Sequence, residues 1–170
     1  MADPEYTIEF SKTGDQAKVS DTSRAVIKRI MAASGVLSVK VTSTARDAYD
    51  QARAMYDNIE SEGVDAQKEL YAQAGQDVID VYVASKAAKK DRNATINDMK
   101  DKIVAIGPGK VSRHCADSAK LEVIDIAPSS IAADKRKDWE TALAAEAGVS
   151  QYFVPPKDPA YHLEIPQDKK

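Results

Sequence analysis

The chain has 170 residues, of which 43% are apolar and 30% are charged. This composition excludes a chain that is disordered throughout, and the length suits one globular domain with a buried core. The single cysteine, Cys115, excludes an internal disulfide and a cysteine-rich zinc module. The 24 Lys and Arg against 27 Asp and Glu leave a net charge of −3, so the composition indicates no nucleic-acid partner.

The N-terminal segment predicts a chain without an export signal. Residues 1–6 lack the basic residues and the apolar stretch of a secretory signal, and no stretch approaches the ~18 apolar residues of a membrane span. We therefore expect synthesis in the cytoplasm without a signal peptide, and no stable membrane insertion. A protein of this kind that acts outside the cytoplasm needs another route of release, or a leader that has been removed.

The first part of the chain predicts alternating strands and helices. Residues 7–10 suit a short strand, and N-cap candidates followed by helically spaced apolar residues predict a helix over 22–34. The alternation of apolar and polar residues over 36–42 predicts a half-buried strand. Residues 47–61 return to helical spacing, with one stripe made of Ala48, Ala52, Met55 and Ile59.

The middle of the chain predicts a helical insertion at about 65–106. Two stretches, 65–90 and 95–106, are rich in Ala, Lys, Asp and Gln and carry no obvious chemistry. We interpret them as a solvated helical hairpin that packs on or covers the rest of the domain. A loop at 107–109, Gly-Pro-Gly, ends this region.

The last part of the chain predicts more strands. Residues 121–126 suit a strand, 131–147 a helix, and 151–154 and 161–165 two short strands around a proline-rich turn. The whole predicts an α+β fold with a small, mainly antiparallel sheet and flanking helices. We expect one domain over 1–170, with the helices 22–34 and 47–61 on one side of the sheet.

Both histidines fall in this last part of the chain. His114 comes just before one strand and His162 lies inside another, with an acidic residue downstream of each. A His, Asp, His set from neighbouring strands supplies three ligands to zinc at about 2.0–2.2 Å and leaves the fourth position open for water. The alternative interpretation of each histidine is a surface or hydrogen-bonded imidazole.

Four short segments stand out, in this order: Thr42-Ser43-Thr44-Ala45-Arg46, Ser112-Arg113-His114, Ile124-Asp125-Ile126 and Tyr161-His162-Leu163-Glu164. They resemble motifs of the zinc D-alanyl-D-alanine peptidase family, which includes VanX/VanY-like carboxypeptidases and phage endolysin peptidases. The first resembles the family's T-S-G-Y-R segment and the second its S-x-H motif. The third resembles the x-D-[ILV] that follows, and the fourth resembles the last strand, whose histidine is the third ligand.

The resemblance implies a zinc site and a set of substrate contacts. The implied ligands are His114, Asp125 and His162. Arg46 is the implied cation that meets a substrate carboxylate or carbonyl, because a guanidinium grips a carboxylate with two hydrogen bonds and stays charged at any working pH. Ser112 and Tyr152 are candidate substrate contacts.

Two positions depart from the family pattern. The usual aspartate follows the histidine by seven residues, whereas Asp125 follows His114 by eleven and Asp117 by three. We favour Asp125, since it lies in the predicted strand, and keep Asp117 as the competing ligand.

The catalytic base is the second departure. Pro159 stands where most relatives carry a glutamate, three residues before the last histidine. Glu164, which shares a strand face with His162, and Asp158, on the loop before it, are the two candidates for the base.

The resemblance implies zinc-dependent hydrolysis of the peptidoglycan stem peptide, at a D-alanyl-D-alanine or a neighbouring bond. The enzyme would act on the cell wall after release or secretion, as a phage lysis enzyme or a secreted antibacterial effector, with a delivery or immunity partner. The alternative is a non-catalytic descendant of the fold that binds cell wall or another protein. Cys115 next to His114 also permits a Cys-His protease, but a small buried thiol suits it better.

Overall fold

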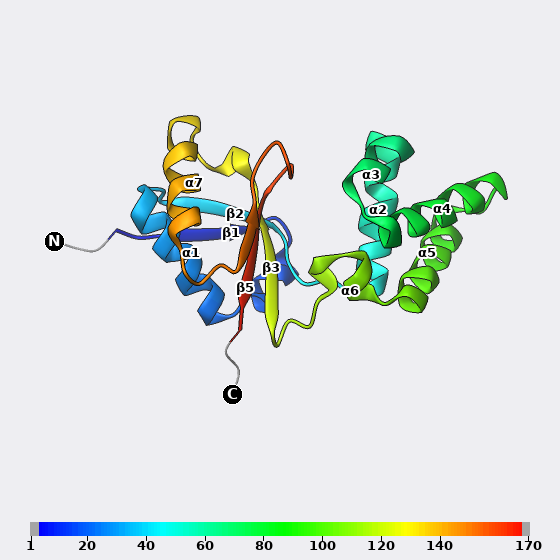
Figure 1. The fold of residues 1–170 in the computed structure, drawn as a ribbon, viewed down its shortest axis with the longest axis horizontal. Coiled ribbons are helices and arrows are strands. Elements are labelled where there is room, and N and C mark those ends of the chain that lie inside the picture. The colour runs from blue at the N-terminus through cyan, green and yellow to red at the C-terminus, as the bar shows by residue number, and fades with distance from the viewer. Residues whose placement is uncertain (1–3, 168–170) are drawn as a thin grey trace. The chain divides into compact units, whose positions relative to one another are not determined.

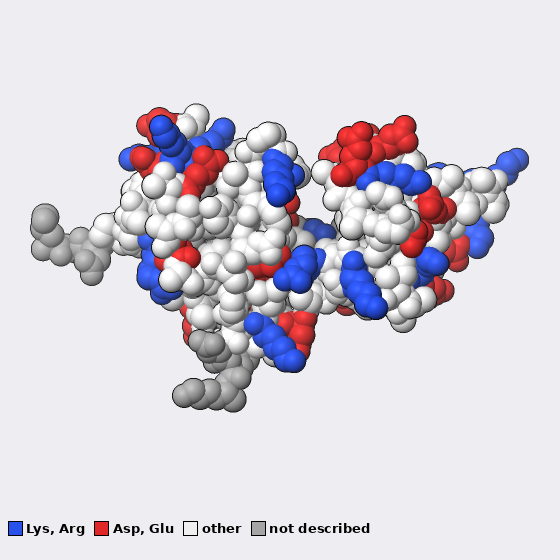
Figure 2. Space-filling view, in the orientation of Figure 1, with Lys and Arg blue, Asp and Glu red and all other residues white. Residues whose placement is uncertain are grey.

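The computed structural model describes residues 4–167, which form two compact units. One unit, here called the sheet unit, holds the residues up to Ala45 and from Asp117 onward. The other, the helical unit, holds Arg46–Ala116. Within the described residues no helix is long and apolar enough to cross a membrane. Figure 2 shows side chains of both charges interspersed over the visible face of each unit.

The sheet unit is built on five strands in the order β1-β2-β3-β5-β4. β1 and β2 are parallel and the other pairs are antiparallel, so the predicted α+β fold with a mainly antiparallel sheet is confirmed. In chain order the strands are β1 (Thr7–Phe10), β2 (Ser38–Ser43), β3 (Leu121–Ile126), β4 (Gln151–Phe153) and β5 (Tyr161–Pro166).

Two α-helices, α1 (Asp21–Ser34) and α7 (Arg136–Ala145), pack on one face of this sheet (Figure 1). Their apolar side chains meet the alternate residues of the strands and form one core. Its buried members include Ile27, Ile30, Met31, Val39, Val41, Ile124, Ile126, Trp139, Leu143, Tyr161, Leu163 and Ile165. Short 3-10 turns complete the unit: Thr13–Lys18, Pro128–Ser130 and Ala133–Lys135.

The helix predicted over 131–147 is shorter than expected, because its first residues form separate turns. The Arg136 guanidinium donates from Nε to the carbonyls of Pro128 and Ile131, both at 3.1 Å. These bonds satisfy carbonyls of the turns before α7, so the regular helix starts only at Arg136.

The helical unit has its own core. Its helices are α2 (Ala48–Glu62), α3 (Val64–Leu70), α4 (Gln73–Ala87), α5 (Arg92–Ile106) and the single turn α6 (Pro108–Val111). A 3-10 turn, Arg113–Cys115, follows them. The core lies between α2, α4 and α5 and contains Ala52, Met55, Tyr56, Ile59, Val78, Ile79, Tyr82, Ile96, Met99 and Ile103.

Two helix predictions are wrong. The expectation that 47–61 flanks the sheet fails, because the apolar stripe of α2 packs against α4 and α5 instead. The single helix expected over 65–90 is two helices, α3 and α4, separated at Tyr71 and Ala72. The Gln76 side chain stabilises this break, since its amide donates to the carbonyls of Lys68 at 3.2 Å and Tyr71 at 3.0 Å.

Candidate functional site

Two candidate residues lie side by side on neighbouring strands of the sheet unit. In the antiparallel pair of β3 and β5, Asp125 is the partner of His162. Strand residues alternate between the two faces, and the neighbours Ile124 and Leu163 point into the core. Asp125 and His162 therefore share the opposite face, and Glu164, two residues after His162, joins them there.

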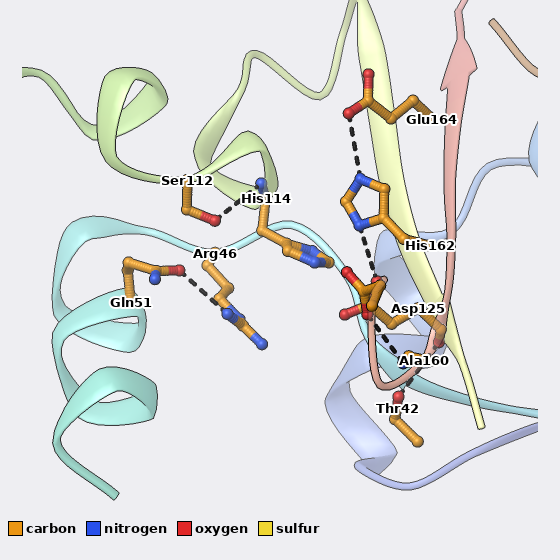
Figure 3. Close-up of polar contacts among 10 residues, drawn as sticks. Thr42, Arg46, Gln51, Ser112, His114, Asp125, Ala160, His162 and Glu164 are labelled. Atoms are coloured by element: carbon orange, nitrogen blue, oxygen red, sulfur yellow. Dashed lines mark hydrogen bonds and ion pairs between the residues drawn. The ribbon is translucent and has the colours of Figure 1, made fainter. Parts of the chain in front are cut away.

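The His162 ring lies between two carboxylates. Its Nδ1 is 3.1 Å from Asp125 Oδ1, and its Nε2 is 3.1 Å from Glu164 Oε1 (Figure 3). A neutral imidazole carries one N–H and can donate to only one of them. The second contact then needs a proton or a metal ion between the nitrogen and the oxygen. The geometry therefore favours a positive charge here, either on a doubly protonated ring or on a metal ion bound to it.

Burial and the neighbouring carboxylates have opposite effects on the pKa of His162. Burial lowers the pKa, because it disfavours the charged ring. The hydrogen bond and the negative charge of Asp125 raise it, and the hydrogen bond of Glu164 and the charge of Asp158 add to that effect. The carboxylates outweigh burial, and the pKa of His162 lies above its ordinary value.

The competing ligand Asp117 lies elsewhere in the sheet unit. It is exposed, its Oδ1 accepts a hydrogen bond from Ala119 N at 3.0 Å, and its carbonyl accepts one from Leu121 N at 2.9 Å. It thus shapes the turn that enters β3, whereas Asp125 stands near the other end of that strand. Of the two candidate aspartates, Asp125 is the one whose carboxylate contacts His162.

Asp158 lies on the loop between β4 and β5, immediately before Pro159. Its Oδ1 accepts a hydrogen bond from Ala160 N at 2.9 Å, and the side chain is half-buried. Its negative charge is close enough to raise the pKa of His162. Glu164 is far less accessible, with 1% of its surface exposed.

The aromatic residue that faces the His162 side of the sheet is Phe153. It is the strand partner of His162, and their ring centroids are 5.4 Å apart. Tyr152, the candidate substrate contact, is the partner of Leu163, whose side chain is in the core. By alternation Tyr152 projects from the face opposite that of His162.

The remaining candidates belong to the helical unit, where Arg46 and His114 meet through their backbones. Arg46 N donates to the His114 carbonyl at 2.8 Å, which ties the first residues of the unit to the last. Ser112 Oγ accepts a hydrogen bond from His114 N at 3.3 Å and so caps the turn that carries the histidine. In this structure Ser112 has a local role in holding the turn.

A glutamine positions the Arg46 side chain. Arg46 Nη1 donates to Gln51 Oε1 at 3.1 Å (Figure 3). Gln51 Nε2 donates in turn to the Tyr71 hydroxyl at 3.2 Å. Gln51 is completely buried on α2. A guanidinium presents its donors in a planar fork whose geometry matches that of a carboxylate.

Two residues of the site, Gln51 and Phe153, were not predicted from the sequence. A signal for Gln51 is present, because it stands three residues after Ala48 and four before Met55, on the apolar stripe of its helix. A buried glutamine needs polar partners, which marks it as a residue that holds another side chain. Phe153 has no such signal, since only the pairing of β4 with β5 sets it beside His162.

The candidate residues therefore form two sets, one in each unit. Asp125, His162, Glu164 and Asp158 belong to the sheet unit, and Arg46, Ser112 and His114 to the helical unit. Compared with known proteins, the chain matches no family model, no curated protein and no solved structure. The residues and their chemistry are thus the basis for assigning a function.

Proposed function

We propose that the protein is a zinc-dependent peptidase that hydrolyses the D-alanyl-D-alanine bond, or a neighbouring bond, of the peptidoglycan stem peptide. Zinc would be held by His114, Asp125 and His162. The observation that carries the proposal is the pairing of Asp125 with His162 on adjacent strands, with the buried Glu164 at the other ring nitrogen. A carboxylate, an imidazole and a carboxylate that orients the imidazole are typical of metal sites.

The donor atoms suit zinc in kind and in spacing. Bonds of about 2.0–2.2 Å in a tetrahedral site separate two ligand atoms by roughly 3.3 Å. Asp125 Oδ1 and His162 Nδ1 are 3.1 Å apart, so a shift of a few tenths of an ångström would admit the ion. His114, Asp125 and His162 together are a group of side chains that could hold a metal ion.

Zinc bound there would supply a Lewis acid for the peptide carbonyl and would lower the pKa of water. Arg46, held by Gln51, would bind a carboxylate of the stem peptide through its guanidinium. Asp158 would carry the proton to the leaving amine, because it is half-buried on a loop, whereas Glu164 is 1% exposed and bound to His162.

Elemental analysis and mass spectrometry of muropeptides test this proposal. The zinc-loaded chain, incubated with purified peptidoglycan, is expected to bind one zinc ion and to release D-alanine or a shortened stem peptide. Asp125→Ala and His162→Ala should lose both metal and turnover. Asp117→Ala is the matched control, because this exposed aspartate does not face His162, and it should keep both.

A non-catalytic descendant that binds cell wall or another protein is the second candidate. Pro159 favours it, because proline stands at the position where relatives carry the proton-transferring glutamate, and proline cannot replace that group. A chain that binds zinc and sediments with peptidoglycan, but leaves the muropeptides unchanged, would support this function and contradict the peptidase.

A further inference from the structure

We infer that Glu164 is a positioning residue, which holds the His162 ring so that Nδ1 is the nitrogen that binds the metal. This inference rests on the proposed zinc site and names the part that Glu164 takes in it. It gives Glu164 a different role from Asp158, which is proposed to carry the proton to the leaving amine.

The contacts of the two ring nitrogens indicate which nitrogen is placed to bind the metal. Nε2 is 3.1 Å from Glu164 Oε1, and Nδ1 is 3.1 Å from Asp125 Oδ1. Asp125 and Glu164 stand on different strands, so the ring is held from both sides. Since Asp125 is the proposed ligand, the nitrogen beside it is the one placed to share a metal ion.

The burial of Glu164 indicates that its carboxylate works through the ring. Only 1% of Glu164 is exposed, and a buried carboxylate needs a hydrogen-bond donor in place of water. An Nε2–H group on His162 would be such a donor, and donating it to Glu164 would hold the ring in the tautomer whose Nδ1 lone pair points toward Asp125 and can bind a metal. A histidine that binds a metal commonly gives its other N–H to a carboxylate in this way.

Strand geometry explains why this arrangement is rigid. Residues two apart on a strand point to the same face, and His162 and Glu164 lie on β5 within the paired part of the sheet. Val123 and Gln151 flank Glu164 as its partners on the neighbouring strands. A side chain held at such a position suits a fixed hydrogen bond better than proton transfer to a substrate.

Nitrogen NMR of the full chain tests the inference directly. In zinc-loaded protein with 15N-labelled histidine, we expect His162 Nδ1 to be the metal-bound nitrogen and Nε2 to carry the proton. Zinc bound through Nε2 would overturn the inference while leaving the peptidase proposal intact. A chain that binds zinc through Nδ1 but releases no stem peptide would overturn the peptidase proposal alone, and a chain that binds no zinc would overturn both.

Zinc affinity of three variants, measured by competition with a chelator, gives a second test. Glu164→Leu removes the acceptor and should weaken zinc binding by about 10- to 100-fold. Glu164→Gln keeps an acceptor oxygen and should restore most of the affinity. Asp158→Asn, the matched control, should bind zinc normally but lose turnover, typically by 10²- to 10⁴-fold.

Two results would contradict the positioning role. One is a zinc affinity of the Glu164→Leu variant equal to that of the wild type. The other is Glu164→Gln that keeps wild-type zinc affinity and loses as much turnover as Asp158→Asn, which would identify Glu164 as a proton-transfer group. If the leucine variant does not fold, the glutamine variant and the NMR spectrum of the wild type still test the positioning role of Glu164.

Discussion

At the residue scale, Cys115 illustrates how its surroundings set the reactivity of a side chain. Its thiol is half-buried, and Sγ lies 4.0 Å from Gln51 Oε1. Burial raises the pKa of Cys115 to about 11, the charge of Arg46 opposes this, and Asp47 and Asp50 add to the rise. A nucleophilic cysteine needs a lowered pKa, so these surroundings favour an inert thiol over a Cys-His protease.

We expect Cys115 to react slowly with iodoacetamide in the native protein. At pH 8 a thiol of pKa about 11 is on the order of a hundredfold less ionised than a free cysteine, whose pKa is about 8.5. Alkylation followed by mass spectrometry should therefore be slower by about that factor in the native chain than in urea. Equal rates in the two conditions would show that Cys115 is a reactive, accessible thiol.

At the element scale, α1 shows how local chemistry sets the ends of a helix. Ser20 begins it, since its Oγ accepts a hydrogen bond from Ser23 N at 3.1 Å. Gly35 ends it in the left-handed conformation, with φ of 72°, and its N–H donates to the Met31 carbonyl. A side chain at a positive φ clashes with its own backbone, so glycine suits this position.

Gly35→Ala should lower the free energy of unfolding by about 1 kcal/mol. The added methyl group would also meet the Lys135 ammonium at 3.3 Å, but that flexible side chain can move away. Gly14→Ala is the control, because nothing lies within 4 Å of the added carbon, and it should change stability by less than about 0.5 kcal/mol. Urea denaturation measures both, and an equal effect of the two substitutions would contradict the explanation.

At the scale of the whole molecule, the chain builds two cores from interleaved segments. The core of the sheet unit draws on residues before and after the helical unit, whereas α2, α4 and α5 come from one continuous stretch. Ion pairs join parts of that stretch: Lys86 of α4 pairs with Glu60 of α2, and Lys90, in the connection after α4, pairs with Asp98 of α5. Water screens such exposed pairs, so the separate apolar core supplies most of the stability of the helical unit.

Separate cores predict separate unfolding. Met99→Ala and Ile124→Ala each remove a fully buried side chain, one from each core, and each should cost about 2–5 kcal/mol. Native-state hydrogen exchange should show faster exchange in α2, α4 and α5 for the first variant, and in β3 and β5 for the second. Loss of protection in both units from a single substitution would show that they unfold together.

Sequence alone determined the elements and the faces that carry the candidate site. The segments 121–126 and 161–165 predicted both strands, and His162 and Glu164 were assigned to one face because strand side chains repeat every second residue. Helical stripes likewise predicted that one side of α1 and α2 is buried.

Only the tertiary structure decided what those faces meet. The apolar stripe of α2 indicates that one face of the helix is buried, but not whether a sheet or other helices cover it. In the structure α4 and α5 cover this face. The pairing of Asp125 with His162 depends on the register between strands far apart in the chain, which no local pattern encodes. The same register, with that of β4, puts Phe153 rather than Tyr152 beside the histidine, because a shift of one residue exchanges the two faces of a strand.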